Sequence, residues 1–158
     1  AYQRALLLLG YRSRSEQEMR KKLTEKNFSV DQVDHVVGRL KKAKLIQDNN
    51  FARAWIENRN TSHPRSQRLM RYELLRKGVD EDHIKNALKI SATDLELAQR
   101  AAEAYARRLT GNDYQAFRKS LSGFLARRGF SYDVIVPVIA DLWKQQHAAI
   151  NINNSEEV

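Results

Sequence analysis

The residues that could do catalytic or metal chemistry are few in this sequence, and their spacing is unfavourable. Its 158 residues include four histidines and no cysteine. No two histidines share a metal-ligand spacing, and no thiolate is present to complete a zinc site. Asp34–His35 and Asp82–His83 are adjacent pairs, and neighbouring side chains on a helix point about 100° apart, so neither pair forms a dyad. We therefore predict a protein that is not an enzyme and that holds no metal and no cofactor.

Basic side chains dominate the charge of the sequence. It has 28 Lys and Arg against 19 Asp and Glu, for a formal net charge of +9. Residues 1–46 hold 11 basic and 5 acidic groups, residues 47–92 hold 9 and 6, and residues 93–158 hold 8 of each. An excess of this sign indicates an acidic partner: a nucleic acid, an anionic membrane surface or an acidic protein. Such a partner should favour the first two of these segments.

Two groups of basic residues are dense enough to suggest a contact surface. The first lies on one predicted helix and comprises Arg65, Arg68, Arg71, Tyr72 and Arg76. All of these except Arg71 fall within about 80° of one another on a helical wheel. Arginines beside an aromatic ring can bind phosphate or a carboxylate-rich partner. The competing interpretation is that long basic side chains only keep this helix solvated.

The second group occupies the stretch GRLKKAKL, and its cations are Arg39, Lys41, Lys42 and Lys44. It lies at the C-terminal end of a predicted helix, where cations also interact favourably with the helix dipole. Four cations in six residues exceed what helix capping needs. We therefore predict a partner contact here as well.

A repeat of 51 residues organises the chain that carries these groups. The stretch SEQEMRKKLTEKNFSVDQV from Ser15 matches SQRLMRYELLRKGVDEDHI from Ser66, and a weaker copy, FRKSLSGFLARRGFSYDVI, begins at Phe117. Three copies at one spacing indicate a small supersecondary unit that buries its apolar face against its neighbours. The predicted repeats are residues 1–46, 47–92 and 93–148, followed by a disordered tail at 149–158.

The hydrophobic period is helical throughout, and no segment alternates as a half-buried strand does. Each repeat is predicted to contain three helices, about nine in all, which makes the protein all-α. The predicted ranges are 2–11, 15–27 and 30–43 in the first repeat, 48–60, 64–77 and 80–90 in the second, and 94–109, 114–128 and 131–146 in the third. Pro64 suits the first turn of its helix, whereas Pro137 should kink the last helix or delay its start.

Residues with special backbone preferences fall at the predicted helix ends. Ser15 and Glu18 have the spacing of a capping box. Asn27, Gly78 and Gly129 follow basic residues at the ends of the second helices, where a left-handed conformation commonly closes a helix. These positions agree with the boundaries that the hydrophobic period predicts.

Three stretches then carry a resemblance to a known family. In KLIQDNNFARAWIENRN, from Lys44 to Asn60, an apolar pair and an Asp precede F-A-x-x-W-I-x-x-R. RLMRYELLRKGV is similar to the signature I-x-x-E-L-x-x-K-G-I, and SRSEQEMRKKL is similar to S-E-x-E-L-R-x-K-L. Together and in this order they resemble the RecX family, regulatory proteins of the bacterial recombinase RecA. The likeness covers residues 1–146, and its motif positions are Asp48, Phe51, Trp55, Arg59, Glu73, Leu74 and Gly78.

The resemblance implies an elongated, curved array of three three-helix repeats that binds in the groove of the RecA–single-stranded DNA filament. It implies inhibition of RecA recombinase, ATPase and co-protease activities, and so an effect on DNA repair and the SOS response. Direct binding of single- and double-stranded DNA is a general property of the family. We expect a cytoplasmic monomer that does not bind membranes. Most motif residues should hold the repeat together, with Asp48 capping the helix that carries Phe51 and Trp55.

Two other functions stay open at this point. The turns at Gly78 and Gly129 join short helices, much as in a helix-turn-helix, so the chain could be a free-standing nucleic-acid-binding module. Against this, the helices after these turns begin with DEDH and SYDV, whose acidity is unfavourable in a DNA groove. A plain helical scaffold is the third possibility. The third repeat loses most of the family motif, and no binding residue is assigned to it.

Overall fold

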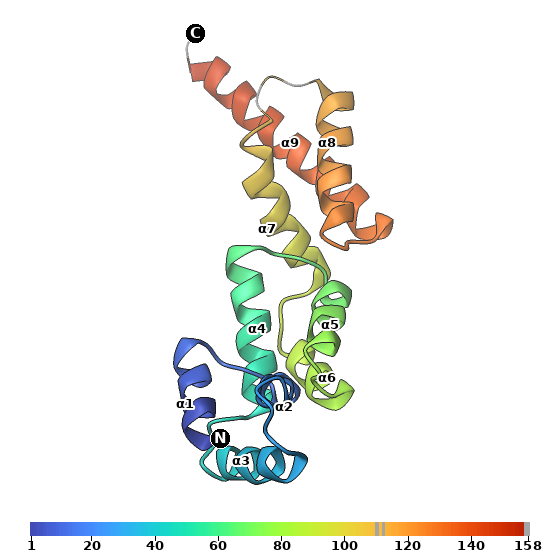
Figure 1. The fold of residues 1–158 in the computed structure, drawn as a ribbon. Helices are drawn as coiled ribbons and strands as arrows, with labels where there is room; N and C mark the ends of the chain where they lie inside the picture. The colour runs from blue at the N-terminus through green and yellow to red at the C-terminus, as the bar shows by residue number, and fades with distance from the viewer. Residues whose placement is uncertain (110, 112, 157–158) are drawn as a thin grey trace. The chain divides into compact units, whose positions relative to one another are not determined.

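The computed structural model describes residues 1–109, 111 and 113–156, with side chains described up to residue 148. This part of the chain contains nine α-helices and no strand (Figure 1). The helices are α1 (Tyr2–Tyr11), α2 (Glu16–Thr24), α3 (Val30–Lys42), α4 (Asp48–Ser62), α5 (Gln67–Arg76), α6 (Glu81–Lys89), α7 (Asp94–Ala106), α8 (Tyr114–Arg127) and α9 (Tyr132–Glu156). The prediction of nine helices is confirmed for the described residues. Every helix except α5 begins within one residue of its predicted start.

The residues form two compact units. The first comprises Ala1–Asn58 and Met70–Ser91, and the second comprises Arg59–Leu69 and Ala92–Val158. Helices α1, α2, α3 and α6 belong to the first unit, and α7, α8 and α9 belong to the second. Both α4 and α5 contribute residues to each unit. The compact units therefore differ from the sequence repeats, whose boundaries stay predictions.

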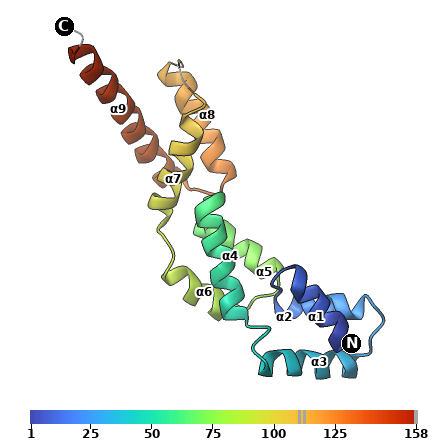
Figure 2. The same ribbon diagram turned by 90° about the vertical axis from the view of Figure 1, so that its left-hand side faces the viewer.

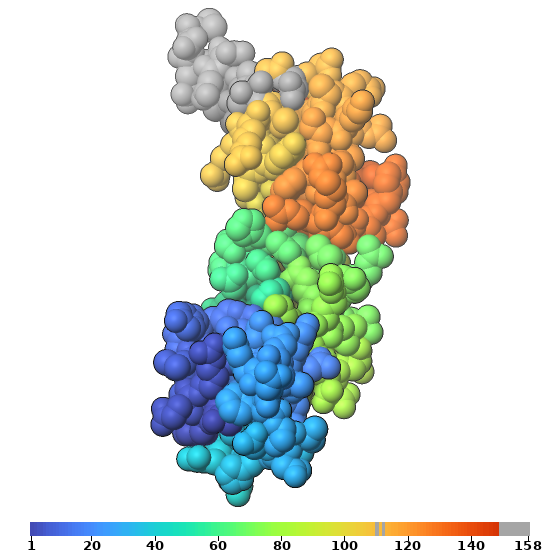
Figure 3. All heavy atoms as spheres, viewed as in Figure 1, coloured from blue at the N-terminus to red at the C-terminus, as the bar shows by residue number. Residues whose placement is uncertain are grey.

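The first three helices bury their apolar faces in a common core of the first unit. Helix α2 contributes Met19 and Leu23, α3 contributes Leu40, and α1 contributes Ala5, and none of these side chains is accessible to solvent. The apolar residues of α3 recur every three or four positions, so that they lie on one face of the helix. Figure 3 shows the atoms of α1, α2 and α3, in blue to cyan, packed together.

In the second unit, α7, α8 and α9 all pack on one another (Figure 2). Phe117, Leu121 and Leu125 form the fully buried face of α8. The buried face of α7 consists mainly of alanines, which include Ala98 and Ala102. Because short side chains reduce the distance at which two helices can pack, this face lets its neighbours approach closely.

The apolar columns of the 51-residue repeat are core positions in all three copies. The first column holds Met19, Met70 and Leu121, and the second holds Leu23, Leu74 and Leu125. None of these six side chains is accessible to solvent. The repeat in the sequence is therefore a repeat of packing.

The left-handed helix ends are confirmed. The backbone angle φ is 65° at Asn27, 78° at Gly78 and 87° at Gly129. Lys44, after α3, has a φ of 57°, which the sequence analysis did not predict. Each of these residues closes a helix where the chain must turn sharply.

Other expectations about helix ends need correction. Pro64 lies in the loop before α5, so it does not occupy the first turn of that helix. Pro137 lies inside α9, which begins at Tyr132, so the helix does not start late. Ser15 accepts a hydrogen bond from the N–H of Glu18 at 3.2 Å, but the Glu18 carboxylate forms ion pairs elsewhere instead of closing a capping box. Helix α9 continues through residues 149–156, where a disordered tail was predicted, and residues 157–158 lie outside the described residues.

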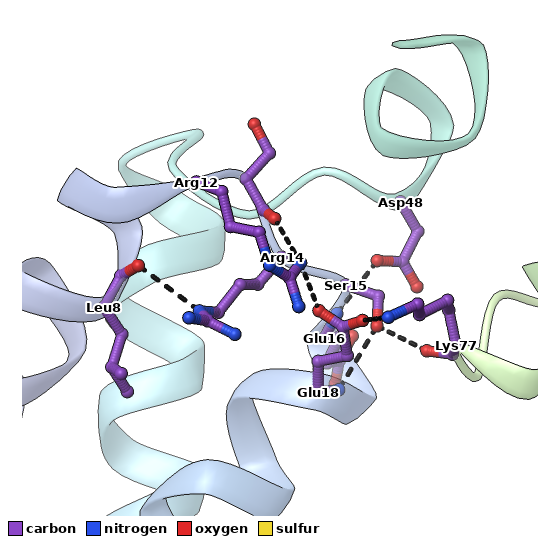
Figure 4. Close-up of polar contacts among 9 residues, drawn as sticks. Leu8, Arg12, Arg14, Ser15, Glu16, Glu18, Asp48 and Lys77 are labelled. Carbon is purple, nitrogen blue, oxygen red and sulfur yellow. Dashed lines mark hydrogen bonds and ion pairs between the residues drawn. The ribbon is translucent and has the colours of Figure 1, made fainter. Parts of the chain in front are cut away.

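A buried polar joint connects the first repeat to the second, and Figure 4 shows most of its members. This first joint consists of Ser15, Glu16, Asp48, Lys77 and Gly78. The Ser15 hydroxyl is fully buried and donates to the carbonyl oxygen of Lys77, while the N–H of Glu16 donates to Asp48 Oδ1 at 3.0 Å. A Cβ atom on Gly78 would lie 1.6 Å from Oε1 of Gln17. The joint therefore requires glycine at this position for space as well as for its positive φ.

A second joint of the same design connects the second repeat to the third. It consists of Ser66, Gln67, Asp94, Arg128 and Gly129. The N–H of the buried Ser66 donates to the carbonyl oxygen of Arg128 at 3.0 Å, and the N–H of Gln67 donates to Asp94 Oδ1 at 2.8 Å. A Cβ atom on Gly129 would lie 2.4 Å from Ser66 Oγ. Each joint therefore fixes the start of one repeat's second helix against the next repeat.

Candidate partner-binding surface

Helix α5 carries part of the first predicted basic group on one face. Arg68, Tyr72 and Arg76 follow one another at intervals of four residues, so they lie on one side of the helix. Tyr72 is 55% exposed, and Cζ of Arg76 lies 5.8 Å from the centre of its ring. This is the geometry of a cation–π contact at the surface. We call these three residues the α5 face.

Arg65 and Arg71, the other members of this group, are placed differently. Arg65 precedes α5, is half-buried, and donates from Nε to the carbonyl oxygen of His63 at 3.1 Å. Arg71 is exposed and forms an ion pair with Glu81, with 2.5 Å between Nε and Oε1. The hydrogen bond to Glu81 and the charge of its carboxylate raise the pKa of Arg71. The arginine least committed to other groups on α5 is therefore Arg68.

The second predicted group, at the end of α3, is partly used within the molecule. Cζ of Arg39 lies 3.8 Å from the centre of the Tyr2 ring, and Nζ of Lys41 lies 3.1 Å from Oε2 of Glu16. Lys42 is exposed in the last turn of α3, and Lys44 is exposed in the turn that follows. Two of the four cations therefore have intramolecular partners, and the structure leaves the other two at the surface.

The family-motif positions bring α4 and α5 together. The indole Nε1 of Trp55 donates to Oε2 of Glu73 at 2.8 Å, and Lys77 places Nζ 5.6 Å from the centre of the Trp55 ring. Phe51 stacks on Trp55 with 6.2 Å between the ring centres, and Leu74 is fully buried. These contacts hold the second repeat together. Arg59, the remaining motif position on α4, lies in its last turn.

Asp48 does not have the role that the sequence analysis predicted. It was expected to cap α4, but it is the first residue of that helix, and its carboxylate accepts the N–H of Glu16 at the start of α2. Burial is the main reason that the pKa of Asp48 is raised, and the hydrogen bond from Glu16 partly opposes this effect. The side chain therefore serves a helix that begins 32 residues earlier in the chain.

The described residues carry side chains suited to binding anionic groups. Among them, no cluster of three His, Asp or Glu side chains is arranged to hold a metal ion. Within the same part of the chain, no helix has both the length and the apolar character needed to span a bilayer. The α5 face presents guanidinium donors beside an aromatic ring, which suits phosphate or carboxylate groups.

Sequence reasoning missed several members of the joints. Ser66 and Arg128 could have been found, because the 51-residue spacing aligns them with Ser15 and Lys77. Asp94 was harder to find, because it lies 46 residues after Asp48 and so falls outside the aligned columns. No local pattern pairs either aspartate with the helix that it caps.

Comparison with known families matches three consecutive segments of the chain. Residues 1–40 match the first three-helix domain of RecX, residues 48–88 the second and residues 92–139 the third. The prediction of a tandem array of three three-helix domains is thereby confirmed. The chain is 36% identical to the regulatory protein RecX of Chlorobium limicola over 140 residues, which cover 89% of this chain and 87% of that protein. It is 32% identical to the regulatory protein RecX of Amycolatopsis mediterranei over 138 residues, 85% of this chain and 78% of that one.

Solved structures agree with the sequence comparison. The crystal structure of RecX from Lactobacillus salivarius superposes with a TM-score of 0.74 at 26% identity, over 89% of this chain and 93% of that chain. A second crystal structure, of a regulatory protein RecX, gives a TM-score of 0.70 at 26% identity, over 87% of this chain and 68% of that chain. The likeness therefore extends to the fold.

Proposed function

The chain belongs to the RecX family of regulatory proteins, and from that membership we propose that it inhibits the recombinase RecA by binding the RecA–single-stranded DNA filament. The observation that carries the proposal is the presence of all three RecX domains, in order, along residues 1–139. The protein acts as a binding partner without an enzymatic activity of its own, and it works in the cytoplasm with RecA. Its effect on strand exchange, ATP hydrolysis and co-protease activity would modulate DNA repair and the SOS response.

The α5 face and the exposed cations Lys42 and Lys44 are the proposed contacts with the filament. Guanidinium and ammonium groups suit both DNA phosphates and the carboxylates of an acidic protein surface. A tandem array offers equivalent helices at several places along one chain, so one molecule can contact more than one subunit of a filament. Occupying the filament in this way would hinder its growth.

The test is the single-stranded-DNA-dependent ATPase activity of RecA with this protein titrated in. A basic helical protein of similar size and charge serves as the control for non-specific competition for DNA. We expect ATP hydrolysis to fall at ratios well below one molecule per RecA subunit, and the control protein to have no effect at those ratios. Equal inhibition by both proteins would contradict specific binding to the filament.

A second candidate function is that of a free-standing nucleic-acid-binding module, which the net charge of +9 favours. Its binding to DNA would fall steeply and linearly in a plot of log affinity against log salt concentration, and it would need no RecA. Strong DNA binding without any effect on RecA at low ratios would favour this second function over the first.

A further inference from the structure

The two joints differ in one charged position, and the repeat makes the comparison direct. In the first joint, the carboxylate of Glu18 lies 2.9 Å from Nη1 of Arg12 and 2.9 Å from Nζ of Lys77. This carboxylate is only 13% exposed, so it neutralises two cations in a largely dehydrated place. In the first joint, the charges of Arg12 and Lys77 are therefore balanced by a carboxylate of the protein itself.

The second joint has one arginine and one histidine in the two basic columns and lacks the carboxylate. At the 51-residue spacing, His63 stands in the column of Arg12, Arg128 stands in the column of Lys77, and Leu69 stands in the column of Glu18. Leu69 does lie at the joint, because a Cβ atom on Gly129 would be 3.0 Å from its own Cβ. The anion that the first joint supplies from within is therefore missing from the corresponding position of the second.

A hollow lies beside His63 and Arg128, the residues in the columns of Arg12 and Lys77. It has a volume of about 250 Å³ and lies between the end of α4, α7 and α8 in the second unit. His63, Arg108 and Arg128 line it together with the aromatic rings of Tyr105 and Phe124, and none of the described residues that line it is acidic. Neither arginine forms an ion pair with a carboxylate of the described residues. The hollow is therefore a basic site with room for a small anionic group.

The surroundings hold Arg128 in place and disfavour its charge. Its carbonyl oxygen accepts the N–H of Ser66 at 3.0 Å, and its Cζ lies 5.0 Å from the centre of the Phe124 ring. Phe124 in turn stacks on Tyr105 at 4.2 Å with 4° between the ring planes, so the wall beneath the guanidinium is rigid. Burial, and then the nearby charge of Arg65, lower the pKa of Arg128. A bound anion would offset both effects, because an opposite charge stabilises the charged form.

We propose that this hollow binds a phosphate group of a nucleotide, held by Arg108 and Arg128, in the place that the Glu18 carboxylate occupies in the first joint. Guanidinium groups bind phosphate through paired, charge-assisted hydrogen bonds. Nucleotide phosphate is the anion that a basic protein of this family meets when it works on a DNA-bound filament. The arginines of the site lie in the third repeat, to which the sequence motifs assign no contact, and the choice of nucleotide phosphate as the ligand rests on the proposed function.

The test measures binding of a fluorescein-labelled oligothymidylate by fluorescence anisotropy, without RecA, across a series of salt concentrations. Each phosphate contact to a single strand contributes about 0.7 to the slope of log affinity against log salt. Because both arginines hold one phosphate, Arg108→Gln with Arg128→Gln should lower the slope by about 0.7. The matched control is Arg107→Gln with Arg127→Gln, which removes the same charge from exposed neighbours outside the hollow. An equal fall in both variants, or no fall in the first, would overturn the proposal.

A reciprocal substitution tests the comparison between the joints. Leu69→Glu restores the carboxylate column and should weaken oligothymidylate binding, because the new carboxylate competes with phosphate for Arg128. Leu69→Gln removes the same leucine without adding charge and should retain binding, and thermal unfolding of both variants checks that each is folded. Loss of binding in both, or in neither, would count against an anion site at this joint.

The source of the phosphate is resolved by a second probe, thymidine monophosphate, measured by calorimetry on the same variants. If the double variant Arg108→Gln with Arg128→Gln loses affinity for both probes, the hollow accepts a terminal phosphate. If it loses affinity for the oligomer alone, the hollow accepts the bridging phosphate of a DNA strand. Because no RecA is present, failure here is distinguishable from failure to inhibit the RecA ATPase.

Discussion

Glu18 shows how one residue can combine several tasks at a helix start. Its N–H is capped by Ser15, while its carboxylate joins Arg12 from the preceding loop to Lys77 from the next repeat. Burial alone would raise the pKa of this carboxyl, but the hydrogen bonds from Lys77 and Arg12 outweigh it and hold the pKa below its ordinary value of 4.5. The ionised form is therefore the one that stabilises the first joint.

The first joint should weaken in acid. Because the pKa of Glu18 is lower in the folded than in the unfolded state, its stabilising effect is present above the unfolded pKa and is lost as pH falls through the folded pKa. Glu16, whose pKa is lowered by Lys41 and Arg20 against the effect of burial, acts in the same direction. We expect the free energy of unfolding, measured with urea, to decline below about pH 5, and Glu18→Gln to make this decline shallower.

The control for this experiment is Glu25→Gln. Glu25 is exposed and pairs with Lys22 across 3.3 Å, and exposed pairs of this kind contribute about 0–1 kcal/mol. This variant should follow the wild-type curve. Asp48 acts in the opposite direction, because its raised pKa makes ionisation unfavourable as pH rises through the folded value. A Glu18→Gln variant with an unchanged acid decline would show that the carboxylate does not stabilise the joint.

At the level of elements, the same set of contacts occurs at the start of two helices, α2 and α5. In both joints a serine precedes the second helix of a repeat. An aspartate of the next repeat accepts the N–H of the residue after that serine, and a glycine of the next repeat lets the two segments of the chain approach closely. The apolar columns alone would leave these helix starts buried with unsatisfied donors, which is costly. The joints therefore turn a stack of apolar faces into a defined arrangement within each unit.

Adding a methyl group at either joint glycine should destabilise the fold. In Gly78→Ala and Gly129→Ala, the positive φ is unfavourable for alanine, and the new Cβ would collide with Gln17 or Ser66. We expect each change to lower the free energy of unfolding by more than about 1 kcal/mol, measured by urea denaturation. Gly78→Ala combined with Gln17→Ala should recover little of this loss, because the Cβ atom that alanine keeps at position 17 would still lie 2.4 Å from the new methyl group.

Gly38 provides the matched control, because it lies within α3 and a Cβ atom there would have no neighbour within 4 Å. Alanine has the higher helix propensity, so Gly38→Ala should stabilise the protein by up to about 1 kcal/mol. If Gly78→Ala and Gly129→Ala stabilised the protein as Gly38→Ala does, the segments could not approach as closely at the joints as the structure shows.

Local sequence patterns predicted the elements well, because their causes are local. The helical period located all nine helices of the described chain, and the 51-residue spacing identified Leu23, Leu74 and Leu125 as equivalent core positions. Gly78 and Gly129 followed from the conformation that helix ends demand. Family resemblance then supplied the RecX assignment, which neither charge nor periodicity could have provided.

The parts that could not be predicted depend on contacts between distant residues. Asp48 looked like a cap for its own helix, but it serves Glu16, and only the packing of the two repeats decides which N–H it meets. A helical wheel set Arg71 apart from the other basic residues of this group, but it could not show that Arg71 pairs with Glu81. The hollow beside Arg128 had no signature at all, because its walls come from three separate helices and a loop.

At the scale of the whole molecule, the basic charge is graded along the chain. The net charge falls from +6 in residues 1–46 to +3 in residues 47–92 and to zero in residues 93–158. Part of the charge in the first repeat is neutralised by pairing, as between Lys41 and Glu16. The α5 face is therefore an exposed basic surface of the second repeat, and the hollow gathers basic residues within a segment that has no net charge.

Reversing the charge of the α5 face should weaken inhibition of RecA without unfolding the protein. Arg68→Glu with Arg76→Glu removes two guanidinium donors from a solvated helix face, so the core beneath it, Met70 and Leu74, is unaffected. We expect the concentration that halves the RecA ATPase to rise about tenfold or more, as the loss of two charge-assisted contacts implies. Circular dichroism and thermal unfolding should match the wild type.

Charge reversal changes the net charge by four, so the comparison needs a variant with the same change elsewhere. Lys85→Glu with Lys89→Glu provides it, because both lysines are exposed on α6 of the same repeat. This control should raise the concentration that halves the RecA ATPase far less. Salt screens attraction between distant charges within about 8–10 Å, whereas a direct contact is not screened in this way. Equal losses in the two variants would assign the effect to overall charge, and unchanged inhibition in the first would exclude the α5 face as a contact. Only a loss confined to Arg68→Glu with Arg76→Glu places the filament against this helix.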